Sequence, residues 1–279
     1  MNSRTITVDD IRGFSQHLEH DEKSRATIDK YHRDVMAFWS FAGGEALAKE
    51  IVMAYKKYLI DQNYAVSSIN SMLASVNAFL EYQDLREYKV KNIRTQRQTY
   101  CSEEKELSKS EYLRLLDASR KNEQLNLVIQ TICGTGIRVS ELQYFTVEAI
   151  RAGQVTVACK NKTRTILVPG KLRKLLLNYV KRKQIASGTI FVTRNGAPLN
   201  RSNIWFAMKR LCEAAGVKAS KVFPHNLRKL FARTFYSMEK DIAKLADILG
   251  HSSINTTRIY IITTGTEHLR RIERLGLVI

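Results

Sequence analysis

The stretch LGHSSINTTRIY, residues 249–260, decides how this chain is interpreted. A helical pattern ends at Leu249, and Gly250 suits the left-handed position that often follows a helix. His251 then lies in a turn, and a new helical pattern places Tyr260 two turns further along the chain. On its own, such a tyrosine usually packs through its ring, and such a histidine usually caps a helix. Neither residue alone therefore indicates a function.

A second stretch upstream, PHNLRKLFARTF at residues 224–235, predicts a helix that begins at its proline. His225 and Arg228 are three residues apart, so both project from one side of that helix. Both also lie near the helix N-terminus, which attracts anions. A phosphate bound there would meet a histidine, an arginine and the positive end of the helix dipole. A His-x-x-Arg pair is weak evidence when it stands alone.

Two further stretches carry basic residues in distinctive surroundings. GTGIRVSEL, residues 134–142, interrupts a helix predicted over 124–133, and a helical turn resumes at Arg138. Residues 149–168 then change to a period of two, with alternating apolar residues on either side of Lys160. This alternation predicts a β-hairpin that has Lys160 close to its tip.

Together, these stretches resemble the tyrosine recombinase family. GTGIRVSEL is similar to the family's first arginine box, the hairpin to its lysine-bearing hairpin, HNLR to its His-x-x-Arg box, and LGHSSINTTRIY to its C-terminal motif. The resemblance covers essentially the whole chain, with the key residues in the family's order and spacing. It implies that six residues are catalytic: Arg138, Lys160, His225, Arg228, His251 and Tyr260.

The reaction that the resemblance implies is transesterification of a DNA phosphodiester through a 3′-phosphotyrosine. Tyr260 would be the nucleophile and His225 its general base, while Lys160 would protonate the leaving 5′-oxygen. The two arginines would stabilise the charge on the phosphate oxygens, because one guanidinium contacts two such oxygens at once. His251 would hydrogen-bond the same phosphate. Because the ester conserves the bond energy, the reaction needs no ATP, metal or other cofactor.

Some positions near these residues remain open to more than one interpretation. Glu141 would hold the Arg138 side chain in place, or it would form only a solvated ion pair at i,i+3 spacing. Lys160 without the family context is an ordinary turn lysine, and Lys162 is a competing general acid because the hairpin lacks the glycines that often flank the family's lysine. Lys229 stands where many members carry a second histidine, and we expect it to point toward solvent or DNA with activity retained.

The net charge of the 279 residues is +18, and its distribution is uneven. Residues 1–86 hold 10 Lys and Arg and 12 Asp and Glu, whereas residues 87–279 hold 35 and 15. A cationic second part favours a nucleic-acid partner over a charge that serves solubility alone. A membrane surface is the second candidate partner.

Composition also limits the classes of site and of location. No group of Cys, His, Asp and Glu has metal-site spacing, and the four cysteines fit no zinc or redox pattern; Cys133, in an apolar helix, reads as a packed thiol. The apolar runs fall far short of the ~20 residues that span a membrane, and no signal peptide is visible. These features predict a cytoplasmic protein without a metal and without a membrane partner.

The predicted fold class is mainly α with a small β-sheet. Four helices, at about 9–19, 24–42, 45–61 and 67–82, would form a core-binding domain over residues 1–86. A basic linker at 87–106 would lead to a mixed α/β catalytic domain with a C-terminal tail over 107–279. Helices 67–82 and 201–214 are candidate readers of the major groove, through Ser71, Ser75, Arg201, Asn203 and Lys209. The candidate DNA contacts are Lys89, Lys91, Arg94, Arg97, Lys162, Arg164, Arg201 and Lys229.

The resemblance also implies partners and an assembly. The protein would clamp double-stranded DNA at specific recombination sites, and a homo-tetramer would pair two such sites. The apolar C-terminal tail would pack into a neighbouring protomer, or onto its own domain. The layout favours a Xer-like resolvase without excluding the integrase of a mobile element. Two other functions remain as alternatives: a type IB topoisomerase-like enzyme that relaxes DNA, and a DNA-binding protein that has lost catalysis.

Overall fold

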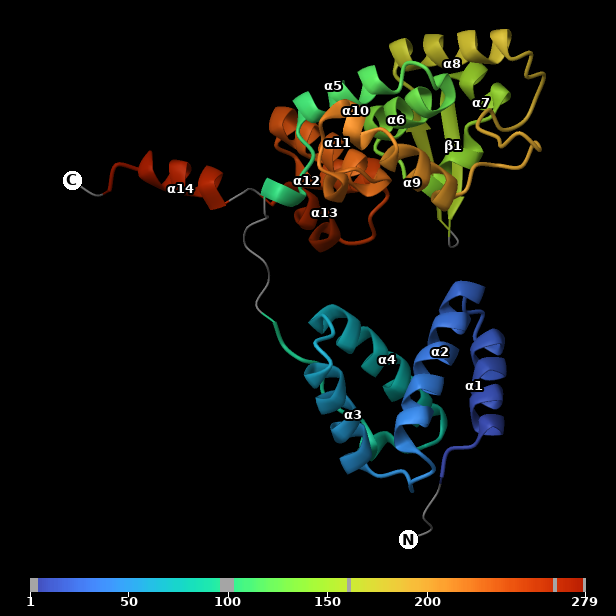
Figure 1. Ribbon diagram of the computed structural model, residues 1–279, viewed down its shortest axis with the longest axis vertical. Helices are drawn as coiled ribbons and strands as arrows, with labels where there is room; N and C mark the ends of the chain where they lie inside the picture. Colours follow the sequence, from blue (N-terminus) through green and yellow to red (C-terminus); the bar gives the residue numbers. More distant parts are fainter. Residues whose placement is uncertain (1–4, 96–102, 160–161, 263–264, 278–279) are drawn as a thin grey trace. The chain divides into compact units, whose positions relative to one another are not determined.

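A computed structural model of the chain describes residues 5–95, 103–159, 162–262 and 265–277 (Figure 1). The chain forms two compact units, Met1–Arg97 and Gln98–Ile279, and each has its own hydrophobic core. The described elements are helices, apart from one two-stranded antiparallel sheet. The predicted fold class, mainly α with a small sheet, is therefore confirmed.

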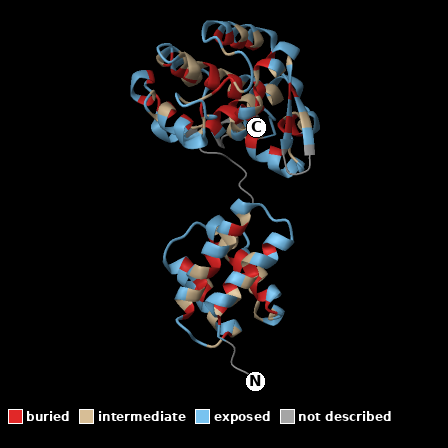
Figure 2. Cartoon of the chain, turned by 90° about the vertical axis from the view of Figure 1, so that its right-hand side faces the viewer, coloured by how far each residue is buried: buried red, intermediate tan, exposed pale blue. Residues whose placement is uncertain are grey.

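The first unit contains the four expected helices, whose bounds follow from their caps. Thr7 and Asp10 form a capping box at the start of the first helix, and Gly43 in the left-handed region ends the second. The third begins at Lys49 rather than at 45, after the turn that follows Gly43. Figure 2 shows their buried faces meeting inside the unit. The helices are α1 (Val8–His20), α2 (Arg25–Ala42), α3 (Lys49–Asp61) and α4 (Val66–Tyr82).

One side chain of this unit lies where we did not expect it. Ser75 was predicted to face DNA from an exposed helix, but it is fully buried. Its hydroxyl donates a hydrogen bond to Asp34 Oδ2 over 2.9 Å, and Lys30 Nζ contacts the same carboxylate oxygen at 2.6 Å. The prediction for Ser75 was wrong because the buried carboxylate on α2 needs partners, and Ser75 is one of them.

The segment expected to be a linker, residues 87–106, has ordered contacts on both sides of residues 96–102. After the 3₁₀ helix η1 (Arg86–Tyr88), Val90 and Ile93 pack against the first core. Their backbone N–H groups donate to the side-chain oxygens of Asn77 and Asn70, over 3.1 and 2.8 Å. On the other side, η2 (Glu103–Lys105) belongs to the second unit.

The second unit is built around the packing of α6 against α11, with α5 beside α6 (Figure 1). The sheet is a hairpin in which Val155 pairs with Ile166 and Val157 with Arg164. The short helix α7 packs against both the first strand of the hairpin, β1, and the helix α8. The elements of this half are α5 (Lys109–Ala118), α6 (Glu123–Thr135), η3 (Val139–Tyr144), α7 (Val147–Ala152), β1 (Gln154–Cys159), β2 (Lys162–Leu167) and α8 (Gly170–Arg182).

The C-terminal half of this unit returns to helices. The helix predicted over 201–214 is two helices, because the chain turns at Arg210 and Leu211 before the second one begins. α12 and α13 pack on each other and on α11. The elements are α9 (Arg201–Lys209), α10 (Cys212–Ala215), η4 (Ala219–Lys221), α11 (Pro224–Glu239), α12 (Ile242–Leu249), α13 (Ile254–Ile261) and α14 (Gly265–Glu273).

Candidate active site

The second unit brings together side chains that the sequence predicted as catalytic. They come from the residue before η3, the first turns of α11, the turn after α12, and α13: Arg138, His225, Arg228, His251 and Tyr260. Lys160 lies outside the described residues. The backbone of Lys162 pairs with Cys159 at the end of the hairpin, and its side chain is not among those described.

Arg228 is almost completely buried, with 2% of its surface exposed. Its guanidinium donates to the carbonyls of Gly136 and Leu249, the second over 2.7 Å, so it ties α11 to the ends of α6 and α12. Burial and the neighbouring charge of Arg138 lower the pKa of Arg228 to about 10, which leaves it cationic at neutral pH. Its Nε is buried without a hydrogen-bond partner among the described residues. This cation is therefore fixed in place, and its Nε donor is unused among the described residues.

His251 makes a hydrogen bond through each ring nitrogen. Its Nε2 lies 3.0 Å from Arg228 Nη2, and its Nδ1 lies 2.8 Å from Thr257 Oγ1. A guanidinium only donates, so Nε2 accepts and Nδ1 carries the proton that is donated to Thr257. Burial and the charges of Arg228, Arg138 and Arg164 lower the pKa of His251 to about 4. The ring is therefore neutral at pH 7, and its tautomer is set by its two partners.

Tyr260 is a buried residue of α13 whose ring contacts both imidazoles. The ring centroids of His225 and His251 each lie 5.1 Å from that of Tyr260. The Arg228 guanidinium carbon lies 5.9 Å from the same centroid, within the range of a cation–π contact. The tyrosine thus has histidines and a fixed cation as neighbours, which is the environment that a phenolic nucleophile needs.

His225 differs from His251 because it is exposed and its ring nitrogens are available. Within the part of the chain that the structure describes, no hydrogen bond joins its ring nitrogens to another residue. Burial of the ring face and the charges of Lys229, Arg228 and Arg201 lower its pKa, whereas Glu106 opposes that change. A neutral imidazole with a free lone pair can take a proton from a phenol.

Glu141 links two arginines beneath this group. Its carboxylate contacts Arg138 Nη1 at 3.0 Å and Arg164 Nη2 at 2.6 Å, and it also accepts the Arg138 backbone N–H. Its side chain is 4% exposed, whereas that of Arg138 is 40% exposed. Of the two interpretations, the solvated surface pair is therefore wrong, because the carboxylate is buried. Arg164, one of the predicted DNA contacts, is held by Glu141 and the Ile248 carbonyl.

Two glycines allow these elements to approach one another. Gly136 caps α6 with a φ of +66°, and a Cβ there would lie 2.4 Å from a ring carbon of Phe231 on α11. Gly250 caps α12 with a φ of +64°, and a Cβ there would lie 2.6 Å from the Arg164 side chain. Left-handed backbone disfavours other residues, and so does the contact. Both glycines lie where the backbone meets the arginines, because the Gly136 carbonyl accepts from Arg228 and the Gly250 carbonyl accepts from Arg138.

The remaining predicted DNA contacts lie in varied settings. Lys229, which we expected to face solvent or DNA, pairs with Glu106: its Nζ lies 3.1 Å from that carboxylate, and 21% of its side chain is exposed. Lys89 pairs with Glu81 in the first unit. Three others are exposed, namely Lys91 and Arg94 in the first unit and Arg201 at the start of α9. Arg97 lies outside the described residues.

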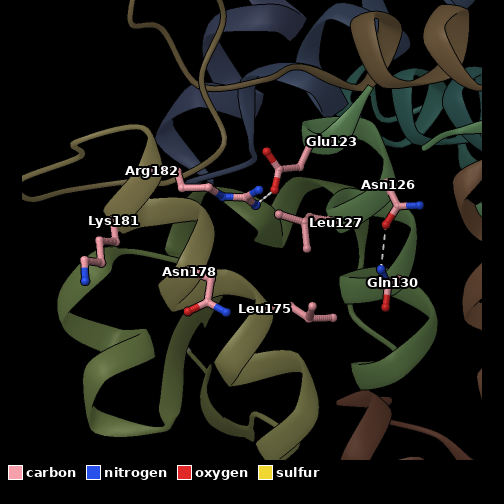
Figure 3. A pocket seen from close by; sticks show the side chains of 8 residues that line it. All are labelled: Glu123, Asn126, Leu127, Gln130, Leu175, Asn178, Lys181 and Arg182. Carbon is pink, nitrogen blue, oxygen red and sulfur yellow. Dashed lines mark hydrogen bonds and ion pairs between the residues drawn. The ribbon is translucent and has the colours of Figure 1, made fainter. Parts of the chain in front are cut away.

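A cavity of about 400 Å³ lies between α6 and α8 (Figure 3). Glu123 pairs there with Arg182, and Gln130 donates to Asn126 over 2.6 Å. None of the predicted catalytic residues lines it. Across the described residues, no three side chains of the metal-binding types come together to form a metal site. In the same residues, no helix is long and apolar enough to cross a membrane.

Several contacts that support the site were not visible in the sequence. Arg164 binds Glu141, Thr257 binds His251, and Glu106 binds Lys229. Of these pairs, only Thr257 and His251 are close together in the sequence. The spacing of six between His251 and Thr257 is a local signal, since the helix that starts after His251 returns toward it. The other partners are separated by at least 23 residues.

Comparison with known proteins agrees with this architecture. The model of the "Phage integrase family" matches residues 105–266, and the model "Phage integrase, N-terminal SAM-like domain" matches residues 11–87. The tyrosine recombinase XerA of Pyrococcus furiosus is 29% identical, over 100% of this chain and 98% of that protein. The tyrosine recombinase XerC of Roseiflexus castenholzii is 27% identical, over 90% of this chain and 87% of that protein.

The fold is also that of a solved recombinase. The crystal structure of a lambda integrase tetramer bound to a Holliday junction has a TM-score of 0.73, with 18% identity over 93% of this chain and 78% of that one. The catalytic family model alone spans more than half of the chain. The chain therefore belongs to the phage integrase family and is a tyrosine recombinase, an enzyme that cuts and rejoins DNA in site-specific recombination.

Proposed function

We propose that Tyr260 attacks the scissile phosphate and that the protein exchanges DNA strands through a 3′-phosphotyrosyl intermediate. The observation that carries this proposal is the contact of the Tyr260 ring with His225, His251 and Arg228. His225 is the general base, because its ring nitrogens are open and its pKa is lowered. His251 is less suited to that role, because both of its nitrogens are already hydrogen-bonded.

Arg138 and Arg228 bind the non-bridging phosphate oxygens in this proposal. Arg138 is partly exposed and is oriented by Glu141, so its fork is available to an anion from solvent. Arg228 is buried, and its unused Nε donor would find its acceptor in the phosphate. Cations that are fixed before the substrate arrives stabilise the transition state without reorganisation. The family resemblance assigns the proton for the leaving 5′-oxygen to Lys160, with Lys162 as the alternative.

The DNA contacts proposed outside the catalytic group lie in both units. Those that are exposed are Lys91, Arg94 and Arg201. α9 also exposes Trp205 and Phe206, and Lys209 lies 5.1 Å from the Trp205 ring centroid. A helix that presents cations beside exposed aromatic rings suits a major groove, where rings contact thymine methyl groups. In the domain arrangement we propose, residues 1–86 and 107–279 both bind DNA.

The assembly proposed is a homo-tetramer on two double-stranded sites, joined by the C-terminal tail. Leu269, Ile272, Leu275 and Leu277 are 49–82% exposed, so the tail does not bury them on its own unit. Leu269 and Ile272 lie on α14 and the other two follow it, and such a run of exposed apolar side chains favours packing against another molecule. The solved lambda integrase on a Holliday junction is a tetramer.

We also propose that the protein acts in the cytoplasm, on either a chromosomal or a mobile-element site.

Covalent trapping on nicked DNA tests the assignment of the nucleophile. Fragmented DNA from the organism that encodes the chain is nicked and incubated with the protein, so that cleavage beside a nick releases a short strand and leaves the enzyme attached. We expect a covalent adduct that is lost in Tyr260→Phe and retained in Tyr58→Phe, a control on α3. An adduct that persists in Tyr260→Phe would refute the assignment. Sequencing the attached DNA identifies the recombination site.

A pair of assays distinguishes the alternative functions. A recombinase joins two copies of the recovered site, whereas a type IB topoisomerase-like enzyme relaxes supercoiled DNA without a second site. A protein that has lost catalysis binds the site but forms no adduct. We expect exchange between two sites, since the described catalytic candidates are gathered as the chemistry requires.

A further inference from the structure

Two side chains other than the predicted catalytic residues hold the β-hairpin against η3. Tyr144, in η3, donates a hydrogen bond from its hydroxyl to the Ala158 carbonyl of β1 over 2.9 Å. Arg164, in β2, contacts Glu141 of η3 at 2.6 Å and also donates to the Ile248 carbonyl. Each strand of the hairpin therefore has its own attachment to the segment that follows Arg138.

These attachments lie close to the turn end of the hairpin. Ala158 pairs with Thr163, and Arg164 pairs with Val157, so the two attached residues are diagonal neighbours across the strands. Among the described residues the sheet has two strands, and such a hairpin is only marginally stable by itself. The direction in which the strands run toward their turn therefore depends on side chains that bind them from outside.

The two attachments differ in what else they hold. Arg164 also binds Glu141, which orients Arg138, so its loss would disturb the phosphate-binding cation as well. The Tyr144 hydroxyl contacts the hairpin, and Ala158 precedes Lys160 by only two residues in the chain. Removing this hydroxyl while keeping the ring would change the hairpin and leave the Glu141–Arg138 pair intact.

We propose that Tyr144 is a positioning residue for protonation of the leaving 5′-oxygen. The inference rests on the proposed function, in which a hairpin lysine supplies that proton. During cleavage the bond between Tyr260 Oη and phosphorus forms and the bond between phosphorus and O5′ breaks. The phenolic proton passes to the general base, and the lysine proton passes to O5′. Tyr144 touches none of these atoms and acts by fixing the strand that leads to the lysine.

The test compares two leaving groups in single-turnover adduct formation by the full-length protein. Suicide duplexes with the recovered site carry either an ordinary scissile phosphodiester or one with sulfur in place of the bridging 5′-oxygen. A thiolate leaves without a proton, so the sulfur substrate does not depend on a general acid. We expect Tyr144→Phe to cleave the oxygen substrate about five-fold more slowly, the effect of one net hydrogen bond. We expect it to cleave the sulfur substrate at the wild-type rate.

Tyr179→Phe is the matched control, because it removes a tyrosine hydroxyl that bonds to Gln124 elsewhere in the same unit. It should leave both rates unchanged. Equal slowing of Tyr144→Phe on the two substrates would show a purely structural role and overturn the inference, as would an unchanged rate on the oxygen substrate. Failure of the wild-type protein to form any adduct is a different result, and it would overturn the proposed function itself.

Discussion

His251 uses both ring nitrogens inside the protein, since Nε2 accepts from Arg228 and Nδ1 donates to Thr257. In this tautomer the ring has no proton on Nε2 to give to a phosphate. A hydrogen bond from His251 Nε2 to DNA therefore requires either the other tautomer, in which the Thr257 hydroxyl donates to Nδ1, or protonation of the ring, which the negative charge of the phosphate favours. Before DNA binds, the residue acts as an acceptor that keeps Arg228 oriented toward Tyr260.

The neutral state of His251 predicts a pH-dependent stability. Burial and three nearby arginines hold its pKa at about 4 in the folded protein, whereas an unfolded histidine titrates near ~6.5. Between these values the unfolded chain binds more protons, so the free energy of unfolding falls as the pH decreases. Urea denaturation at pH 7 and pH 5 measures this loss. His251→Gln, which cannot titrate, should show a smaller loss, and an equal loss in the variant would contradict this assignment.

At the residue level, proximity was predictable from sequence where motif residues lie close together along the chain. His225 with Arg228, and Arg138 with Glu141, share one helical turn, so their proximity follows from local geometry. The ion pair of Arg164 was not predicted, because its carboxylate partner is 23 residues away. The ion pair of Lys229 was not predicted for a similar reason, since a helical wheel shows which side it faces but not the partner 123 residues away.

At the scale of elements, the predicted bounds are best where a cap residue determines them. α11 begins at Pro224, and α12 ends before the left-handed Gly250, as the sequence indicated. η3 is a 3₁₀ helix rather than the expected helical turn, and its six residues are too few for the two periods to be distinguished. α7 was missed for the same reason, although Thr146 and Gly153 cap it. Short segments do not contain enough turns to show a period.

The C-terminal cap of α6 leads to a prediction about Gly136. Both Gly136 and Gly188 have positive φ, but only Gly136 has an obstacle, since a Cβ there would meet Phe231 at 2.4 Å and nothing lies within 4 Å at Gly188. We expect Gly188→Ala to lower the free energy of unfolding by about 1 kcal/mol, the cost of a left-handed alanine. Gly136→Ala adds displacement of a packed ring and should cost about 3 kcal/mol. Urea denaturation of the two variants measures the difference, and equal losses would show that the contact with Phe231 relaxes freely.

At the scale of the whole molecule, charge is divided between the two units. Met1–Arg97 holds 14 Lys and Arg against 13 Asp and Glu, and Gln98–Ile279 holds 31 against 14. This imbalance was predictable because net charge depends on composition and not on the fold. The contacts of segment 87–106 were not predictable. Its polar composition resembles that of a linker, whereas Asn70 and Asn77 bind its backbone.

The charge division predicts that the two units differ in the salt dependence of DNA binding. Each has its own core, so residues 5–95 and 103–279 are suitable as separate fragments. Each phosphate neutralised by a protein cation contributes about −0.9 to the slope of log affinity against log salt. We therefore expect a clearly steeper slope for the second fragment, measured by fluorescence anisotropy on one duplex between about 50 and 200 mM salt. The intact chain should show a slope at least as steep. If the first fragment matched or exceeded the second, the cationic excess of the second unit would lie away from the DNA.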